Sequence, residues 1–144
     1  MINTNDFEDL KVNIKIKLSA LWTSVTFCYL YGDYFELYVP QKTQGLINGV
    51  NMLDSPIKLF AASILLSIPS LMIFLSIILK PTINRRMNII LGILYTAMMV
   101  LIALTSITPW RIFYVFLAIV ESCITTLIVF YAWKWKKNKA ETIN

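Results

Sequence analysis

Residues 64–79 read Ile64-Leu-Leu-Ser-Ile-Pro-Ser-Leu-Met-Ile-Phe-Leu-Ser-Ile-Ile-Leu79 and contain no charged side chain. With its flanking residues this apolar segment covers 57–79, and as an α-helix it is long enough to cross a hydrocarbon core of about 30 Å. Apolar side chains occur on every face, whereas a helix in a soluble bundle would carry a polar stripe. A helix also satisfies its backbone hydrogen bonds internally, which a lipid environment requires. The segment therefore predicts a membrane-spanning helix.

Three further apolar segments of similar length accompany this one. They cover 18–39, 87–107 and 110–133. Pro40 ends the first of them, whereas Pro56 and Pro109 each follow a residue suited to cap a helix and occupy the first helical position. We therefore predict an all-α fold, an integral membrane four-helix bundle that forms a single domain over residues 1–144.

The overall composition favours the same class of protein. Of the 144 residues, 58% are hydrophobic and 15% are charged, whereas charged residues make up roughly 25% of a soluble domain. The net charge of +5 does not indicate nucleic-acid binding, because the lysines and arginines gather at the ends of the apolar segments. We predict that the partner is the lipid bilayer, with no nucleic acid.

The distribution of lysine and arginine predicts the orientation of the chain. Ten of the thirteen lie in residues 1–17, 80–86 and 134–144, and three lie on the opposite side of the predicted bundle. Positively charged residues are retained on the cytoplasmic side of a membrane. We therefore predict that 1–17 and the basic residues 134–144 are cytoplasmic tails, and that 40–56 is an outer loop.

The first segment, 18–39, is the least suited to lipid. It contains eight Leu, Ile, Val or Phe residues, against fourteen in 57–79. A central aspartate costs roughly 2.5–3.5 kcal/mol on insertion, which is about the gain from eight such residues, and Asp33 lies within this segment. Its polar residues share one helical face, which we predict points into the bundle. They are Trp22, Thr26, Tyr29, Asp33 and Glu36.

A further acid, Glu121, lies near the middle of segment 110–133 and shares a helical face with Thr125. Gly92 and Thr96, four residues apart, form a small-residue pair that allows helices to approach closely. We expect the acids and nearby hydroxyl groups to line one polar interior. The candidate residues are Asp33, Glu121, Tyr29, Thr26, Ser67 and Thr125.

Two interpretations of these acids remain open. In the functional interpretation, Asp33 or Glu121 exchanges a proton or binds a cation. In the structural interpretation, both acids are protonated or hydrogen-bonded and hold the bundle together. Glu36, which lies close to Pro40, is interpreted instead as a solvated residue at the membrane interface.

Residue types that support catalysis or metal binding are scarce. The sequence contains no His, and its two cysteines, Cys28 and Cys123, form no Cys-X-X-Cys motif. Zinc, haem and thioredoxin-type redox sites are therefore poorly supported. No pair of nucleophile and base is visible either. We predict no metal site, no cofactor and no enzymatic activity.

Four stretches carry a resemblance that extends over nearly the whole chain. They are Tyr31-Gly32-Asp33, residues 68–76, residues 84–90, and Glu121 followed by Tyr131-Ala132-Trp133-Lys134-Trp135. Together they resemble a family of small bacterial four-helix integral membrane proteins, a domain of unknown function. The resemblance implies a bacterial source and the cytoplasmic (inner) membrane, and it implies no activity.

These observations favour a multi-pass protein of the bacterial inner membrane. The acids favour a small-solute or proton-coupled carrier, and we expect it to form an oligomer because four helices enclose little volume. The alternative is a structural or accessory membrane subunit without chemistry of its own. Its partner would be a second copy of the chain or another membrane protein.

Overall fold

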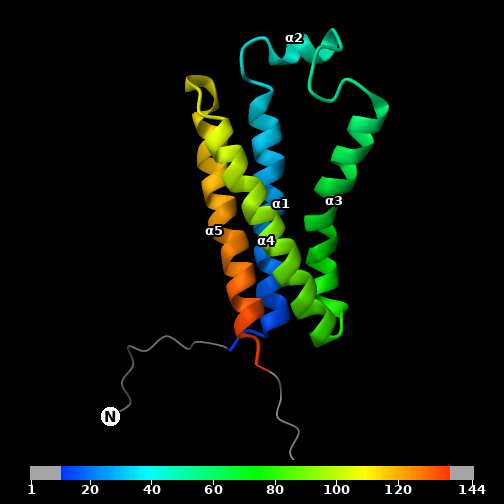
Figure 1. The fold of residues 1–144 in the computed structure, drawn as a ribbon, viewed down its shortest axis with the longest axis vertical. Coiled ribbons are helices and arrows are strands. Elements are labelled where there is room, and N and C mark those ends of the chain that lie inside the picture. Colours follow the sequence, from blue (N-terminus) through cyan, green and yellow to red (C-terminus); the bar gives the residue numbers. More distant parts are fainter. Residues whose placement is uncertain (1–10, 137–144) are drawn as a thin grey trace, which may run out of the picture.

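The computed structural model describes residues 11–136, and this part of the chain contains helices and no strand (Figure 1). Its elements are α1 (Ile14–Glu36), α2 (Lys42–Ile47), α3 (Pro56–Ile78), α4 (Pro81–Thr105), the short 3-10 helix η1 (Pro109–Arg111) and α5 (Ile112–Lys134). The prediction of an all-α fold is confirmed. The four long helices correspond to the four predicted segments, and the structure adds the short helix α2 within the predicted outer loop.

Three of the helices are long and apolar enough to cross a membrane. They are Pro56–Ile78, Pro81–Thr105 and Pro109–Lys134, the last of which combines η1 with α5. Helix α1 has the length but is not one of the three. The low hydropathy of α1 agrees with the small number of lipophilic residues in this segment. Whether α1 can cross a membrane therefore depends on how its polar face is covered.

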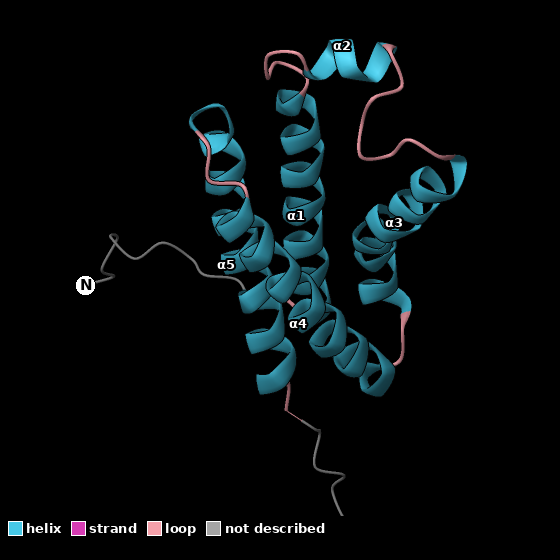
Figure 2. Ribbon diagram, turned by 45° about the horizontal axis from the view of Figure 1, so that its top comes forward, coloured by secondary structure: helices cyan, strands magenta, loops and turns pink. Residues whose placement is uncertain are grey.

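The long helices are arranged so that α1 contacts both α3 and α5, while α4 packs along α5. Helices α3 and α4 follow each other directly but approach closely at few positions. Figures 1 and 2 both show α3 turning away from α1 toward the end that carries α2. The three-dimensional order therefore places α1, the least lipophilic helix, between two others.

The helix boundaries follow local capping signals. The Ser55 side chain caps α3 by accepting a hydrogen bond from the Lys58 backbone N–H at 3.4 Å. Helix α4 begins at Pro81, six residues before the predicted start at 87, so only Leu79 and Lys80 connect it to α3. A proline fits this first helical position because its fixed φ is helical and its missing N–H would have no partner there.

A chain of buried polar groups joins α1, α4 and α3 on the side away from α2. The Trp22 indole donates a hydrogen bond to Asn88 Oδ1 at 2.7 Å. The Asn88 amide donates to Asn84 Oδ1 at 2.6 Å, and the Asn84 amide donates to the Ser76 carbonyl at 2.5 Å. All four residues are fully buried. Three helices are thereby connected by hydrogen bonds whose direction and length fix their relative positions.

Helices α4 and α5 approach each other closely at Gly92. A Cβ atom added there would lie 2.6 Å from the Val129 side chain and 3.4 Å from the Thr125 carbonyl oxygen. One turn further along, the Thr96 hydroxyl donates to the Thr125 hydroxyl at 2.7 Å. The prediction that Gly92 and Thr96 allow a close helix contact is therefore confirmed.

A proline inside α3 frees a carbonyl that another helix satisfies. Pro69 has no N–H, so the carbonyl of Leu65 lacks the hydrogen bond that residue 69 would give it in a regular helix. The Tyr95 hydroxyl of α4 donates to this carbonyl at 2.6 Å. The bond ties α4 to α3 although the two helices have few other close approaches.

The Tyr95 bond predicts a non-additive pair of substitutions. Tyr95→Phe should lower the free energy of unfolding by about 1–3 kcal/mol, because the Leu65 carbonyl then has no donor. In a Pro69→Ala background, residue 69 supplies its own N–H, so Tyr95→Phe should cost less than about 1 kcal/mol. Unfolding of the purified protein in mild detergent measures both costs. An equal cost in the two backgrounds would contradict this account of the bond.

The buried Trp22 indole predicts that replacing Trp22 lowers stability more than replacing Trp110. Trp22→Phe should destabilise the fold by about 1–3 kcal/mol, because Asn88 Oδ1 loses its donor in a buried site. Trp110 is 65% exposed, so Trp110→Phe should change stability by no more than about 0.5 kcal/mol. The same unfolding measurement compares the two variants, and similar losses in both would refute the assigned role of Trp22.

Candidate functional site

Asp33 and Glu121 line one cavity of about 110 Å³ between the long helices. Helix α1 contributes Asp33 and Gly32 to its wall, and α5 contributes Glu121. The other lining residues are Tyr29, Leu65, Leu66, Met98, Met99, Ile102, Tyr114, Leu117 and Ala118. A space of this size accommodates several water molecules or one small solute.

The two acids occupy different positions in this cavity. Asp33 is an exposed residue, whereas Glu121 is only 4% exposed. Because both line the same space, the cavity extends from an accessible carboxyl group to a buried one. Gly32 is buried beside this space, and a Cβ there would make an ordinary van der Waals contact with the Tyr114 ring at 3.4 Å.

The Glu121 carboxyl group has no protein partner among the described residues. The ion pairs of residues 11–136 involve Glu36 and Asp54, and no side-chain hydrogen bond reaches the carboxyl oxygens of Glu121. The hydroxyl of Tyr29, in the same cavity, is also buried without a hydrogen-bond partner. The cavity thus presents polar groups that the surrounding protein leaves unsatisfied, which is uncommon for buried groups.

The structure places the other candidate residues as follows. Thr26 is half-buried, and its hydroxyl donates to the Trp22 carbonyl at 2.9 Å. Thr125 is fully buried and lies at the α4–α5 contact, where its hydroxyl donates to the backbone carbonyl of Glu121 at 2.9 Å. Neither residue lines the cavity. Both face the interior as predicted, but they stabilise helices and do not complete the site.

The prediction that Ser67 lines the polar interior is wrong. Ser67 is exposed on α3, and its hydroxyl donates to the carbonyl of Ile64 at 2.8 Å within its own helix. A serine that bonds its own backbone needs no partner from another helix, so its polarity does not decide which way it faces. The α3 residues that line the cavity are the leucines at 65 and 66.

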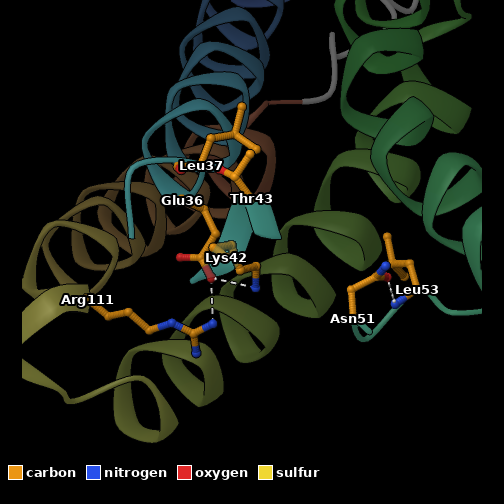
Figure 3. A network of polar contacts seen from close by, with 7 residues as sticks. All are labelled: Glu36, Leu37, Lys42, Thr43, Asn51, Leu53 and Arg111. Atoms are coloured by element: carbon orange, nitrogen blue, oxygen red, sulfur yellow. Dashed lines mark hydrogen bonds and ion pairs between the residues drawn. The ribbon is translucent and has the colours of Figure 1, made fainter. Parts of the chain in front are cut away.

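The interpretation of Glu36 as a solvated residue is also wrong. Its side chain is 14% exposed, and Oε1 forms an ion pair with Lys42 Nζ at 2.8 Å and accepts a hydrogen bond from Arg111 Nη2 at 2.5 Å. Figure 3 shows the carboxyl group between these two cations, which come from α2 and η1. Glu36 therefore ties the end of α1 to two connecting segments and does not belong to the cavity.

A metal centre of the usual kind is not visible in residues 11–136. No three His, Cys, Asp or Glu side chains in this part of the chain lie close enough together to hold a metal ion. Two acids line the cavity, and the rest of its wall is mostly apolar. The arrangement suits the binding of a proton or of a single cation better than a multi-ligand metal site.

Comparison with known proteins gives one match. Residues 6–142 match DUF6326, a family of unknown function. The chain belongs to this family. The match includes every residue of the cavity, and the predicted resemblance to a family of unknown function is confirmed. No curated protein and no solved structure matches the chain.

Sequence reasoning missed the residues that hold the DUF6326 bundle together beside the cavity. Asn84 and Asn88 are four residues apart, so they share one helical face, and both are fully buried. Asn84 precedes two arginines and lies before the predicted start of its segment at 87, so the sequence did not indicate an inward-facing pair. Pro69 does predict a kink or a freed carbonyl in its segment, but nothing in the sequence indicates Tyr95 as the donor to Leu65.

The Glu36 ion pairs predict that neutralising Glu36 lowers stability more than neutralising Asp54. Glu36→Gln should lower stability by about 1.5–3 kcal/mol, the range for hydrogen bonds to charged groups. The matched control is Asp54→Asn, whose partner Lys58 is on the next turn and whose side chain is 50% exposed, so its loss should stay below about 1 kcal/mol. Detergent unfolding at neutral pH compares them, and an equal or reversed ranking would exclude the assigned role.

Proposed function

We propose that this DUF6326 chain is a carrier of the bacterial inner membrane that moves a small solute, coupled to protons. In this proposal all four long helices cross the membrane, both termini are cytoplasmic, and the lipid bilayer and a second copy of the chain are its partners. The proposed role is transport, with neither enzymatic activity nor a cofactor.

The helical arrangement supports the membrane part of the proposal. Helices α3, α4 and α5 are long and apolar enough to cross a bilayer. Helix α1 lies between α3 and α5, with Trp22 fully buried and Thr26 and Tyr29 half-buried on its polar face. Covering these three residues with protein lowers the cost of placing α1 in lipid, while Asp33, on the same face, is exposed and lines the cavity. Ten of the thirteen Lys and Arg lie near the two termini or in residues 80–86, which favours cytoplasmic ends.

The observation that carries the transport proposal is the shared cavity of Asp33 and Glu121. A buried acid without a partner is costly in an apolar surrounding, and such residues commonly mark the path of an ion or proton. The cavity reaches from the exposed Asp33 to the buried Glu121. A proton or cation could therefore move between two carboxyl groups within one space.

The titratable groups of this cavity come from two helices. Helix α1 supplies Tyr29 and Asp33, and α5 supplies Tyr114 and Glu121. The lining residues of α3 and α4 are apolar and carry no ionisable group. Asp33 is thus the other carboxyl group in the cavity that can accept a proton released by Glu121. This exchange is the basis for coupling the movement of a solute to the movement of protons.

A structural or accessory role is the second candidate, and one observation favours it. Buried polar groups elsewhere in this bundle, the Trp22 indole and the amides of Asn84 and Asn88, serve only to connect helices. The acids of the cavity could serve the same end through a partner protein. In that case their neutralisation would change stability or partner binding and leave solute movement unaffected.

Transport by the acids predicts the loss of coupled proton movement after neutralisation. Asp33→Asn and Glu121→Gln should each reduce solute-dependent proton movement at least tenfold, because neither amide accepts a proton at neutral pH. Proteoliposomes that contain a pH indicator measure this movement with a panel of small cations, anions and neutral solutes. Asp54→Asn, an exposed acid outside the cavity, should behave as the unmodified protein.

Detergent unfolding of the same variants separates the two candidate functions. Transport requires that the acid variants lose proton movement while keeping a normal midpoint of unfolding. Proton movement that is unchanged in both variants would exclude the carrier. Unchanged movement together with a clear loss of stability or of a co-purifying membrane protein would instead support the accessory role.

A further inference from the structure

We propose that the cavity between α1 and α5 binds a small organic cation, a protonated amine with a compact alkyl group. The inference rests on the proposed carrier function and names the class of its substrate. It follows from the charge of the cavity, the character of its walls and its size.

The cavity wall carries two carboxyl groups and no basic side chain. Among the described residues, Arg111 and Lys42 are engaged by Glu36, and Lys58 is engaged by Asp54. None of the lining residues is a lysine or an arginine. A positively charged ligand would supply the counter-charge that Glu121 lacks, and an anion would meet two carboxyl groups.

The walls of the cavity are those of an organic ligand site. Apart from the two acids and the phenol groups of Tyr29 and Tyr114, the lining side chains are apolar, from Leu65, Leu66, Met98, Met99, Ile102, Leu117 and Ala118. A bare inorganic cation requires several oxygen ligands to replace its water shell, and leucine and methionine provide none. An alkylammonium ion needs one or two acceptors for its N–H groups and otherwise prefers apolar and aromatic contacts.

Two residues with unsatisfied groups are suited to the ammonium group. Glu121 is 4% exposed and its carboxyl oxygens have no partner within residues 11–136. The buried hydroxyl oxygen of Tyr29 also has no partner and lies in the wall of the same cavity. An ammonium ion could donate one N–H to each. The ligand would thereby give a hydrogen-bond partner to both groups.

The size of the cavity limits the ligand. Its volume of about 110 Å³ is smaller than the cavity of roughly 150 Å³ that accommodates benzene in an engineered protein. The alkyl group is therefore restricted to a few carbon atoms, which excludes bulky aromatic cations. Gly32 marks this limit, because a methyl group added there would lie 3.4 Å from the Tyr114 ring and 3.7 Å from the Leu117 side chain.

Direct binding to the purified full-length protein tests the inference independently of transport. Isothermal titration calorimetry at one pH and ionic strength compares ethylammonium with sodium and with the bulky tetraphenylphosphonium ion. Ethylammonium should bind saturably, and sodium and tetraphenylphosphonium should not. Glu121→Gln should weaken ethylammonium binding at least tenfold, and Tyr29→Phe, which loses one hydrogen bond, by about three- to tenfold.

Gly32→Ala is the variant that isolates cavity size. It changes no charge, and the added methyl group makes ordinary contacts at 3.4–3.8 Å, so the protein should fold normally. Ethylammonium binding should weaken by about threefold or more because the cavity is narrower, and methylammonium should be affected less. Asp54→Asn should leave binding unchanged. Detergent unfolding checks each variant, so the inference remains testable through Gly32→Ala and Tyr29→Phe if Glu121→Gln does not fold.

Each outcome separates this inference from the carrier proposal. Sodium binding as strong as that of ethylammonium would overturn the organic cation in favour of an inorganic one. Tight binding of tetraphenylphosphonium would overturn the size limit. Proton movement that depends on the acids without any amine binding would overturn the inference and leave the carrier proposal standing. Ethylammonium binding without acid-dependent proton movement would support the ligand and refute the carrier.

Discussion

Buried backbone and side-chain polar groups in an apolar helix bundle must find their hydrogen-bond partners inside the protein. The fold depends on this constraint at its least regular points. Pro69 leaves the Leu65 carbonyl without a helical donor, and Tyr95 of another helix supplies one. The Trp22 indole reaches Asn88, whose own amide is held by Asn84. These bonds select one arrangement of α1, α3 and α4, where leucine and isoleucine contacts alone would allow many.

In the cavity, buried polar groups lack hydrogen-bond partners within the described part of the chain. Among residues 11–136, the buried side-chain atoms without a hydrogen-bond partner are the Tyr29 hydroxyl, Glu36 Oε2 and Ser76 Oγ. Glu36 already has two cations on its other oxygen, which gives it a structural explanation, whereas the Ser76 hydroxyl has none because Asn84 bonds the Ser76 backbone carbonyl. Tyr29 also has none, and it shares its cavity with the unpaired Glu121. An unpaired phenol and an unpaired carboxyl group in one cavity favour a ligand over a packing role.

The sequence predicted the features that local physics determines. Helix type, the cap at Ser55, the inward direction of Trp22 on α1 and the close contact at Gly92 depend on residues near in sequence or on one helical face. The Thr108 side chain, in contrast, makes no capping bond, and Asp33 of the same α1 face is exposed. The orientation of a side chain was not predictable where it depends on segments distant in sequence. Ser67 satisfies itself within its own helix, so polarity gives no direction. The partners of Glu36 lie in α2 and η1, and their approach to α1 is a result of the whole fold.

The structural network and the cavity are connected through Tyr95, so the two interpretations of the polar interior are not independent. The Tyr95 ring lies edge-on to Trp22 at 5.9 Å and beside Tyr29 at 6.2 Å between ring centroids. Its hydroxyl holds the carbonyl of Leu65, a residue of the cavity wall. A shift of α3 about Pro69 would therefore move that wall and the ring next to Tyr29 together. Buried hydrogen bonds that appear purely structural thus determine the shape of the space in which Asp33 and Glu121 meet.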